Sequence, residues 1–227
     1  MSVIKKLPKA IIFDLDGTLL DTLEDLTDAV NATLEYFNYP KRSLAEVKSF
    51  VGNGIDLLVK RAVPKSTENS IYQKCLVYFK KYYQNHILVK TKPYEGIPRL
   101  LTELKRLGIK MAIVSNKIQA GVSELNQLFF SDWVDVALGD QPGLALKPSS
   151  DSVNKAITLL GLDKTDLIYY VGDSETDYLT AKNADLPFIG VTWGFRSSDQ
   201  LQEVGAHLMI DEPSQLLKLM QSEKFQL

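Results

Sequence analysis

The sequence has little of the chemistry that cysteine and histidine provide. Cys75 is the only cysteine among 227 residues, so no intrachain disulfide can form, and we expect a cytoplasmic protein. Only two histidines are present, His86 and His207. They are isolated from each other in the sequence, and we expect each to be structural rather than half of a metal site.

Long apolar stretches and runs of like charge are also missing. No apolar segment approaches the roughly 20 residues that cross a membrane, and residues 1–13 lack the apolar region of a signal peptide. The net charge is −2, without a run of Lys or Arg. We therefore expect neither nucleic acid nor a membrane as a partner. The length allows one large or two modest domains.

One stretch, Asp14–Thr18, organises the rest of the chain. It follows the apolar run Ala10–Phe13, which is typical of a strand buried on both faces of a parallel sheet. Side chains two apart on an extended segment share a face, so we expect the carboxylates of Asp14 and Asp16 to lie side by side. Such a pair repels unless a cation lies between them or one holds a proton. Mg²⁺ is the cation we expect, although Asp is also common in turns and caps.

The hydrophobic pattern divides the chain into an α/β core and a helical insert. We predict a Rossmann-like parallel sheet with helices on both faces, because strands and helices alternate after residue 96. Residues 21–90 have helical spacing throughout and predict an inserted four-helix cap domain placed to act as a lid. The predicted domains are residues 1–20 with 91–227 for the catalytic core, and 21–90 for the cap. The predicted strands are 10–13, 109–114, 134–138, 167–171, 187–191 and 207–210.

Polar residues follow other predicted strands as well. Ser115 and Asn116 come after the second strand, where a hydroxyl and the N–H groups of a helix N-terminus would form an anion site. Lys147 follows a glycine-containing loop, and Asp173 follows the strand 167–171. Each has an ordinary alternative, as a helix cap or a solvated charge. Together they predict a metal site beside an anion site, which is what phosphoryl transfer requires.

Four motifs strengthen this interpretation. In order and spacing they resemble the motifs of the haloacid dehalogenase-like hydrolase superfamily, and the match covers essentially the whole chain. The helical insert resembles the C1 cap of that superfamily. Residues Phe50–Gly54 and Gly190–Phe195 further resemble the phosphoglycolate phosphatase group, whereas Ser150 departs from it where relatives often carry a proline. The four motifs are Asp14–Thr18, Ser115–Lys117, Lys147–Pro148 and Gly172–Asp177.

The resemblance implies a role for each motif residue. Asp14 would be the nucleophile and a Mg²⁺ ligand, Asp16 the general acid and base with a backbone carbonyl on Mg²⁺, and Asp173 a further metal ligand. Asp177 would lie next to the metal ligands without binding the ion, or serve only as an acid in the first turn of a helix. The phosphoryl group would be held by Ser115, Asn116, Gly17 and Lys147, with Thr18 orienting the Asp14 loop.

Two further sites stay open on the sequence alone. Gly52, Asn53 and Gly54 form a tight turn that needs positive φ, and they are equally candidates for a specificity loop that contacts the substrate. Arg196 is a candidate for binding a substrate carboxylate, with a solvated arginine as the alternative that we favour.

The function predicted from these features is a Mg²⁺-dependent phosphatase. It would hydrolyse a small phosphomonoester, with 2-phosphoglycolate as one candidate, through a phospho-aspartate intermediate. The alternatives are a phosphomutase acting on a sugar phosphate and, in another class, a phospho-accepting signalling switch. The expected partner is a small phosphorylated metabolite, and the expected state is a monomer or a homodimer.

Overall fold

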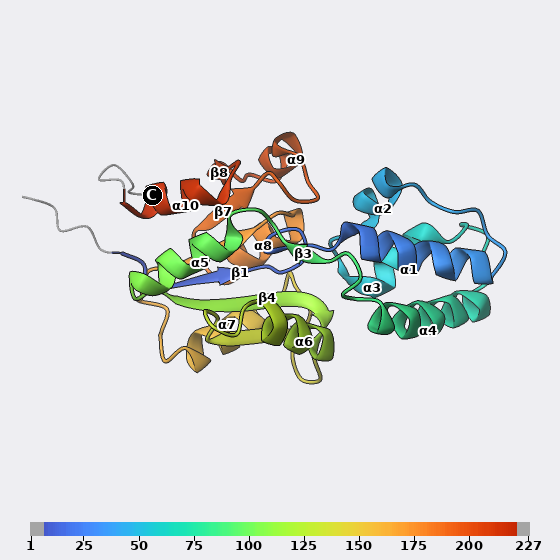
Figure 1. Cartoon of the computed structure of the whole chain (residues 1–227), viewed down its shortest axis with the longest axis horizontal. Helices are drawn as coiled ribbons and strands as arrows, with labels where there is room; N and C mark the ends of the chain where they lie inside the picture. Colours follow the sequence, from blue (N-terminus) through green and yellow to red (C-terminus); the bar gives the residue numbers. More distant parts are fainter. Residues whose placement is uncertain (1–6, 222–227) are drawn as a thin grey trace, which may run out of the picture. The chain divides into compact units, whose positions relative to one another are not determined.

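The computed structural model describes residues 7–221, and the prediction about a leader at residues 1–6 lies outside this range. The chain divides into two compact units, Met1–Leu19 with Pro93–Leu227, and Leu20–Lys92. Figure 1 labels the helices α1 to α4 within residues 20–92. The assignment of residues 21–90 as a cap over a site stays a prediction.

The first unit is built on a six-stranded sheet whose paired strands run parallel, in the order β5-β4-β1-β6-β7-β8. This sheet, with its surrounding helices, confirms the predicted α/β class. The strands are β1 (Ala10–Phe13), β4 (Lys110–Ile118), β5 (Val136–Asp140), β6 (Ile168–Gly172), β7 (Phe188–Val191) and β8 (Met209–Ile210).

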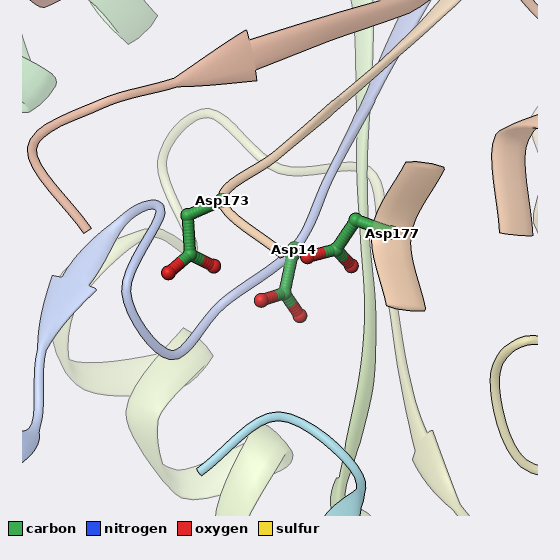
Figure 2. A group of neighbouring side chains, drawn as sticks. All are labelled: Asp14, Asp173 and Asp177. Atoms are coloured by element: carbon green, nitrogen blue, oxygen red, sulfur yellow. The ribbon is translucent and has the colours of Figure 1, made fainter. Parts of the chain in front are cut away.

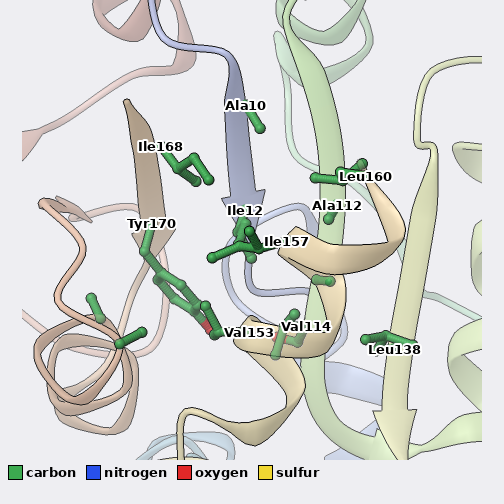
Figure 3. Close-up of a cluster of buried hydrophobic side chains, with 13 residues drawn as sticks. Ala10, Ile12, Ala112, Val114, Leu138, Val153, Ile157, Leu160, Ile168 and Tyr170 are labelled. Atoms are coloured by element: carbon green, nitrogen blue, oxygen red, sulfur yellow. Dashed lines mark hydrogen bonds between the residues drawn. The ribbon is translucent and has the colours of Figure 1, made fainter. Parts of the chain in front are cut away.

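The core of this unit covers both faces of the central strand β1. Ala10 and Ile12 belong to one apolar cluster with residues of α7 and α8 (Figure 3). Ile11 and Phe13, which alternate with them and so face the other way, are also buried. The helices of this unit are α5 (Ile97–Arg106), α6 (Gln119–Phe129), α7 (Asp151–Leu159), α8 (Glu175–Asn183), α9 (Ser198–Glu203) and α10 (Pro213–Gln221).

The second unit contains the four predicted helices, α1 (Leu23–Tyr36), α2 (Leu44–Phe50), α3 (Gly54–Ala62) and α4 (Asn69–Asn85). The predicted capping box of α2 is present, because Ser43 and Glu46 exchange hydrogen bonds. The sequence did not predict the short strands β2 (Leu20–Asp21) and β3 (Lys92–Pro93), which pair with each other. None of the described helices is long and apolar enough to cross a membrane.

Most strands of the sheet have boundaries that differ from the predictions by one to four residues. Strand β4 continues to Ile118 because Ile118 pairs with Asp140 beyond an irregularity in the register, so α6 begins at Gln119 rather than at Lys117. Strand β5 begins at Val136 rather than at Val134, because the N–H of Val134 is used in a turn with Phe130. The longer β4 changes the setting of Ser115, as described below.

Packing of α7 against the sheet provides a matched test of the core. Ile157 is 3% exposed within the apolar cluster, whereas Leu159 on the same helix is 57% exposed. We expect Ile157→Ala to lower the free energy of unfolding by about 2–5 kcal/mol, because it removes buried methyl groups and leaves a cavity. Leu159→Ala should change it by less than about 0.5 kcal/mol. Urea unfolding of both variants measures this, and equal losses would contradict the described packing.

Candidate active site

Three carboxylates meet where strands β1 and β6 end. Asp14 follows the last residue of β1, and its N–H donates to the carbonyl of Val171 on β6 (2.9 Å). Asp173 follows the last residue of β6, and Asp177 lies in the first turn of α8. All three are buried, with candidate ligand oxygens within 4.8 Å of one another (Figure 2). Adjacent parallel strands therefore bring together acids that are far apart in the sequence.

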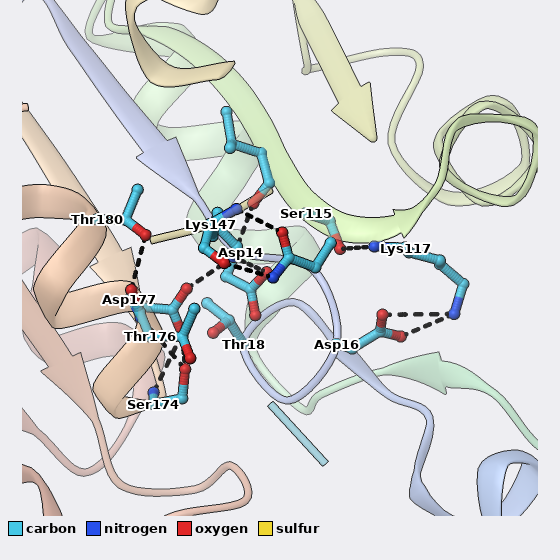
Figure 4. A network of polar contacts seen from close by, with 12 residues as sticks. Asp14, Asp16, Thr18, Ser115, Lys117, Lys147, Ser174, Thr176, Asp177 and Thr180 are labelled. Atoms are coloured by element: carbon cyan, nitrogen blue, oxygen red, sulfur yellow. Dashed lines mark hydrogen bonds and ion pairs between the residues drawn. The ribbon is translucent and has the colours of Figure 1, made fainter. Parts of the chain in front are cut away.

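The ammonium group of Lys147 lies between two of these carboxylates. Its Nζ is 2.7 Å from Asp14 Oδ1 and 2.7 Å from Asp177 Oδ1 (Figure 4). It also donates to the carbonyl of Val114 (3.1 Å) and lies 3.2 Å from the hydroxyl of Tyr170. This side chain is 4% exposed, so the alternative of a solvated lysine is wrong, whereas its catalytic role stays a prediction.

Asn116 fixes the backbone of Lys147. Its Oδ1 accepts from the N–H of Lys147 (2.7 Å), and its Nδ2 donates to the carbonyl of the same residue (3.0 Å). The side chain of Asn116 is thus used to position Lys147, whereas the sequence predicted only a backbone N–H for phosphate. That role for the N–H stays a prediction.

Burial and like charge perturb the carboxylates. Burial and the nearby Asp177 raise the pKa of Asp14 to about 7, against the opposing effect of Lys147. The pKa of Asp173 is raised well above its usual value, first by burial and then by Asp177 and Asp14. Burial alone would lower the pKa of Lys147, but Asp14 and Asp177 together raise it well above the usual value. Three carboxyl groups thus lie around one ammonium group, and a cation bound among them would favour their ionised forms.

Asp16 does not share a face with Asp14, contrary to the prediction. The chain leaves the extended conformation after Phe13 and bends at Leu15, whose carbonyl accepts from the N–H groups of Thr18 and Leu19. The carboxylate of Asp16 instead lies 3.0 and 3.4 Å from Nζ of Lys117, a side chain that is 4% exposed. Figure 4 shows this pair apart from Asp14 and Lys147. The structure therefore does not place the side chains of Asp14 and Asp16 around a common cation.

Ser115 does not lie at a helix N-terminus, because β4 extends past it and α6 begins only at Gln119. Its hydroxyl accepts a hydrogen bond from the N–H of Lys117 (3.2 Å). The alternative in which Ser115 caps the next helix is therefore wrong as well. Ser115 is buried at the strand end, beside the motif residue Asn116, and its phosphate-binding role stays a prediction.

Gly17 and Thr18 both contact Asp173. The hydroxyl of Thr18 donates to Asp173 Oδ1 (3.4 Å), and a Cβ at Gly17 would lie 2.4 Å from Asp173 Oδ2. A side chain at Gly17 would therefore displace the carboxylate. The sequence predicted that Thr18 orients the Asp14 loop, whereas the Thr18 hydroxyl contacts Asp173.

Asp177 uses both of its oxygens within the protein. Oδ1 accepts from Lys147, and Oδ2 accepts from the N–H and hydroxyl of Ser174 in a capping box at the start of α8. Asp177 is thus the predicted acid in the first turn of a helix, and it also lies beside Asp14 and Asp173. Its place next to metal ligands stays a prediction.

The other predicted residues lie elsewhere or have different surroundings. Gly52, Asn53 and Gly54 belong to the helical unit, and positive φ at Gly52 (+128°) and Gly54 (+84°) confirms the tight turn. Their role toward a substrate stays a prediction. Arg196 is buried rather than solvated, because its Nε lies 2.9 and 3.0 Å from the carboxylate oxygens of Glu175.

Sequence reasoning missed two residues that the structure places at the site. Lys117 belongs to one of the four motifs, but nothing in its spacing indicates the ion pair with Asp16. Tyr170 appears in the sequence as one more apolar-strand residue, yet its hydroxyl lies 3.3 Å from Asp177 Oδ1 as well as beside Lys147. The only available signal was a polar atom in a strand whose position predicts full burial.

Comparison with known proteins gives consistent results. Residues 11–191 match the family model described as haloacid dehalogenase-like hydrolase. The chain is 36% identical over 192 residues to phosphoglycolate phosphatase from Neisseria meningitidis serogroup A, covering 82% of this chain and 81% of the relative. It is 31% identical over 219 residues to phosphoglycolate phosphatase 1 from Pseudomonas aeruginosa, covering 93% and 79%.

Solved structures agree with this similarity. A crystal structure from Lactobacillus delbrueckii subsp. bulgaricus, described as a candidate phosphoglycolate phosphatase, is 34% identical with a TM-score of 0.91. The match covers 95% of this chain and 99% of the other. The fold, the helical unit included, is thus shared over nearly the whole length of both chains.

The raised pKa of Asp14 predicts a pH effect on stability when divalent cations are removed. A carboxyl whose pKa rises from 3.8 to about 7 on folding stabilises the protein fully below pH 3.8, and this contribution is lost as the pH rises toward 7. In chelator, wild type should therefore lose stability relative to Asp14→Asn between pH 5 and 7, by at most about 1.4 kcal/mol per pH unit. Urea unfolding at several pH values measures this. A difference in free energy of unfolding between wild type and Asp14→Asn that does not change with pH would contradict the raised pKa of Asp14.

Proposed function

The chain belongs to the haloacid dehalogenase-like hydrolase family and is a phosphatase; from this premise we propose that it hydrolyses a small phosphomonoester through a phospho-aspartate on Asp14. The observation that carries the proposal is the placement of Lys147 Nζ between Asp14 and Asp177, with Asp173 beside them. An ammonium group fixed against the nucleophile is suited to hold a phosphoryl group as negative charge develops on its oxygens.

In the first half of the reaction, an oxygen of Asp14 attacks phosphorus and the bond to the ester oxygen breaks. Lys147 already holds Oδ1 of Asp14, so the attacking carboxylate is oriented before the substrate arrives. The leaving oxygen takes a proton from Asp16. The Asp16 carboxylate lies 3.0 Å from Nζ of Lys117 in the structure, so this step requires the protonated Asp16 carboxyl to move from Lys117 to the leaving oxygen.

In the second half, water attacks the acyl-phosphate. Asp16, now ionised, takes a proton from the water, the bond between phosphorus and the Asp14 oxygen breaks, and inorganic phosphate leaves. We propose that Ser115, the N–H of Asn116 and Gly17 hold the phosphoryl oxygens during both halves. Asn116 also holds the Lys147 backbone, so its substitution would affect both contacts.

The residues present fit a magnesium ion. Asp14 and Asp173 offer buried carboxylate oxygens within 4.8 Å, and oxygen ligands are those that Mg²⁺ prefers. We propose that these two hold it together with the backbone carbonyl of Asp16, while Asp177 holds Lys147. When bound, Mg²⁺ would neutralise charge on the phosphoryl oxygens and on the crowded carboxylates.

We propose a small metabolite as substrate, and 2-phosphoglycolate as the first candidate, because similar proteins from Neisseria and Pseudomonas are named phosphoglycolate phosphatases. Gly52, Asn53 and Gly54 remain the proposed specificity loop. A cytoplasmic location remains a prediction from the single cysteine.

A phosphate-release screen over many metabolite phosphoesters with Mg²⁺ tests the proposed function. We expect turnover of small phosphomonoesters, its loss in excess chelator, and a fall in kcat of about 10³-fold or more in Asp14→Asn, because the amide is not a nucleophile. Asp132→Asn, at an exposed aspartate, is the matched control and should behave as wild type. Full activity of Asp14→Asn would overturn the assignment of the nucleophile.

Substrates with different leaving groups distinguish a general-acid role of Asp16 from a structural one. In Asp16→Asn, kcat/KM for an alkyl phosphate should fall about 10²–10⁴-fold, because the leaving alkoxide needs a proton. For p-nitrophenyl phosphate, whose leaving group is stable as an anion, kcat/KM should fall less than about tenfold. Stopped-flow and steady-state rates with both substrates measure the difference. Equal losses of kcat/KM would assign Asp16 a structural role instead.

A further inference from the structure

The loop after β7 contacts the surroundings of Asp173 at several points. We call residues 193–195 the clamp loop. The backbone N–H of Phe195 donates to Asp173 Oδ2 (2.6 Å), and the indole Nε1 of Trp193 donates to the carbonyl of Thr18 (3.0 Å). Since the Thr18 hydroxyl donates to Asp173 Oδ1, the loop contacts one oxygen of Asp173 directly and the other through Thr18.

Gly194 brings the backbone of the clamp loop against the same carboxylate. A Cβ at this position would lie 2.4 Å from Asp173 Oδ2 and 2.4 Å from the carbonyl oxygen of Gly17. A Cβ at Gly17 would also lie 2.4 Å from Asp173 Oδ2. Two glycine backbones therefore enclose the Asp173 side chain, and an added methyl group at Gly194 has to move either that side chain or the backbone.

Both ends of the clamp loop are anchored outside the site. Before it, the hydroxyl of Thr192 donates to Asp211 (2.7 Å), and its N–H donates to the carbonyl of Ile210 (3.1 Å). After it, Arg196 pairs with Glu175, the first residue of α8. A loop fixed at both ends can restrict the carboxylate between them to one orientation.

We propose that the clamp loop is a positioning element for Asp173 and so sets the affinity of the site for its divalent cation. Groups that hold a ligating carboxylate contribute to metal affinity because they fix the ligand before the ion binds. This inference rests on the metal site proposed above and adds residues outside the four motifs. Trp193, Gly194 and Phe195 contact Asp173 or its neighbours and need not touch the substrate.

Mg²⁺ binding to the full-length protein, measured by calorimetry without substrate, tests the proposal. We expect Gly194→Ala to weaken Mg²⁺ binding roughly 10- to 100-fold, and Trp193→Phe to weaken it near the low end of that range. The Mg²⁺ concentration for half-maximal activity should rise in parallel. For Trp193→Phe, kcat at saturating Mg²⁺ should return to within about twofold of wild type, because the ion restores the ligand geometry.

Two substitutions serve as matched controls. The three atoms nearest to a Cβ at Gly190, on β7, would belong to the side chains of Met209, Leu201 and Phe188, so Gly190→Ala should leave Mg²⁺ affinity unchanged. Trp133→Phe makes the same chemical change as Trp193→Phe, at a tryptophan that follows α6. It should also leave Mg²⁺ affinity unchanged.

The outcomes separate the proposal from its premise. Wild-type Mg²⁺ affinity in Trp193→Phe and in Gly194→Ala would overturn the positioning role, and Trp193→Phe alone decides if Gly194→Ala does not fold. Asp173→Asn tests the premise: wild-type Mg²⁺ affinity in that variant would overturn the metal site itself. Weaker binding in Asp173→Asn and in both clamp-loop variants, with unchanged controls, supports the proposal.

Discussion

The contact of the Lys147 ammonium with Asp14 and Asp177 is the interaction on which the site depends. Its partners come from four places in the fold: the residue after β1, the middle of β4, the strand β6 and the first turn of α8. Removing the Lys147 ammonium from water costs free energy, and the hydrogen-bond acceptors around it compensate that cost. Because Asn116 holds the backbone of the same lysine, the geometry of Asp14, the proposed nucleophile, depends on residues of β4 and β6 as well as its own strand.

The parallel sheet and the family could be predicted from the sequence because their signals are local. Apolar runs such as Ala10–Phe13 mark buried strands, and the acids that follow them must meet at one edge of a parallel sheet. The match of residues 11–191 confirms the resemblance that the motifs indicated. The structure brings Asp14, Lys147, Asp173 and Asp177 together, whereas their individual roles remain proposals.

Tertiary contacts decided what the sequence could not. The spacing of Asp14 and Asp16 predicts a shared face only while the chain stays extended, and the bend at Leu15 ends that condition. The partner of Asp16 is Lys117, whose side chain is buried at the end of a strand. Arg196 similarly looked solvated because its partner Glu175 is distant in the sequence. In each case a long-range ion pair, which leaves no periodic pattern, determines where the side chain lies.

The pairing of β2 with β3 has a consequence for how such a chain could have arisen. The helical unit leaves the α/β unit at Leu20 and returns at Lys92, and these two ends lie hydrogen-bonded beside each other. Asp25 reinforces this closure by accepting hydrogen bonds from the N–H groups of Lys90 and Thr91. A segment whose ends already meet can be gained, lost or exchanged without stretching the host fold. Evolution could therefore vary the inserted helices as a separate module while the strand ends that carry the acids stayed unchanged.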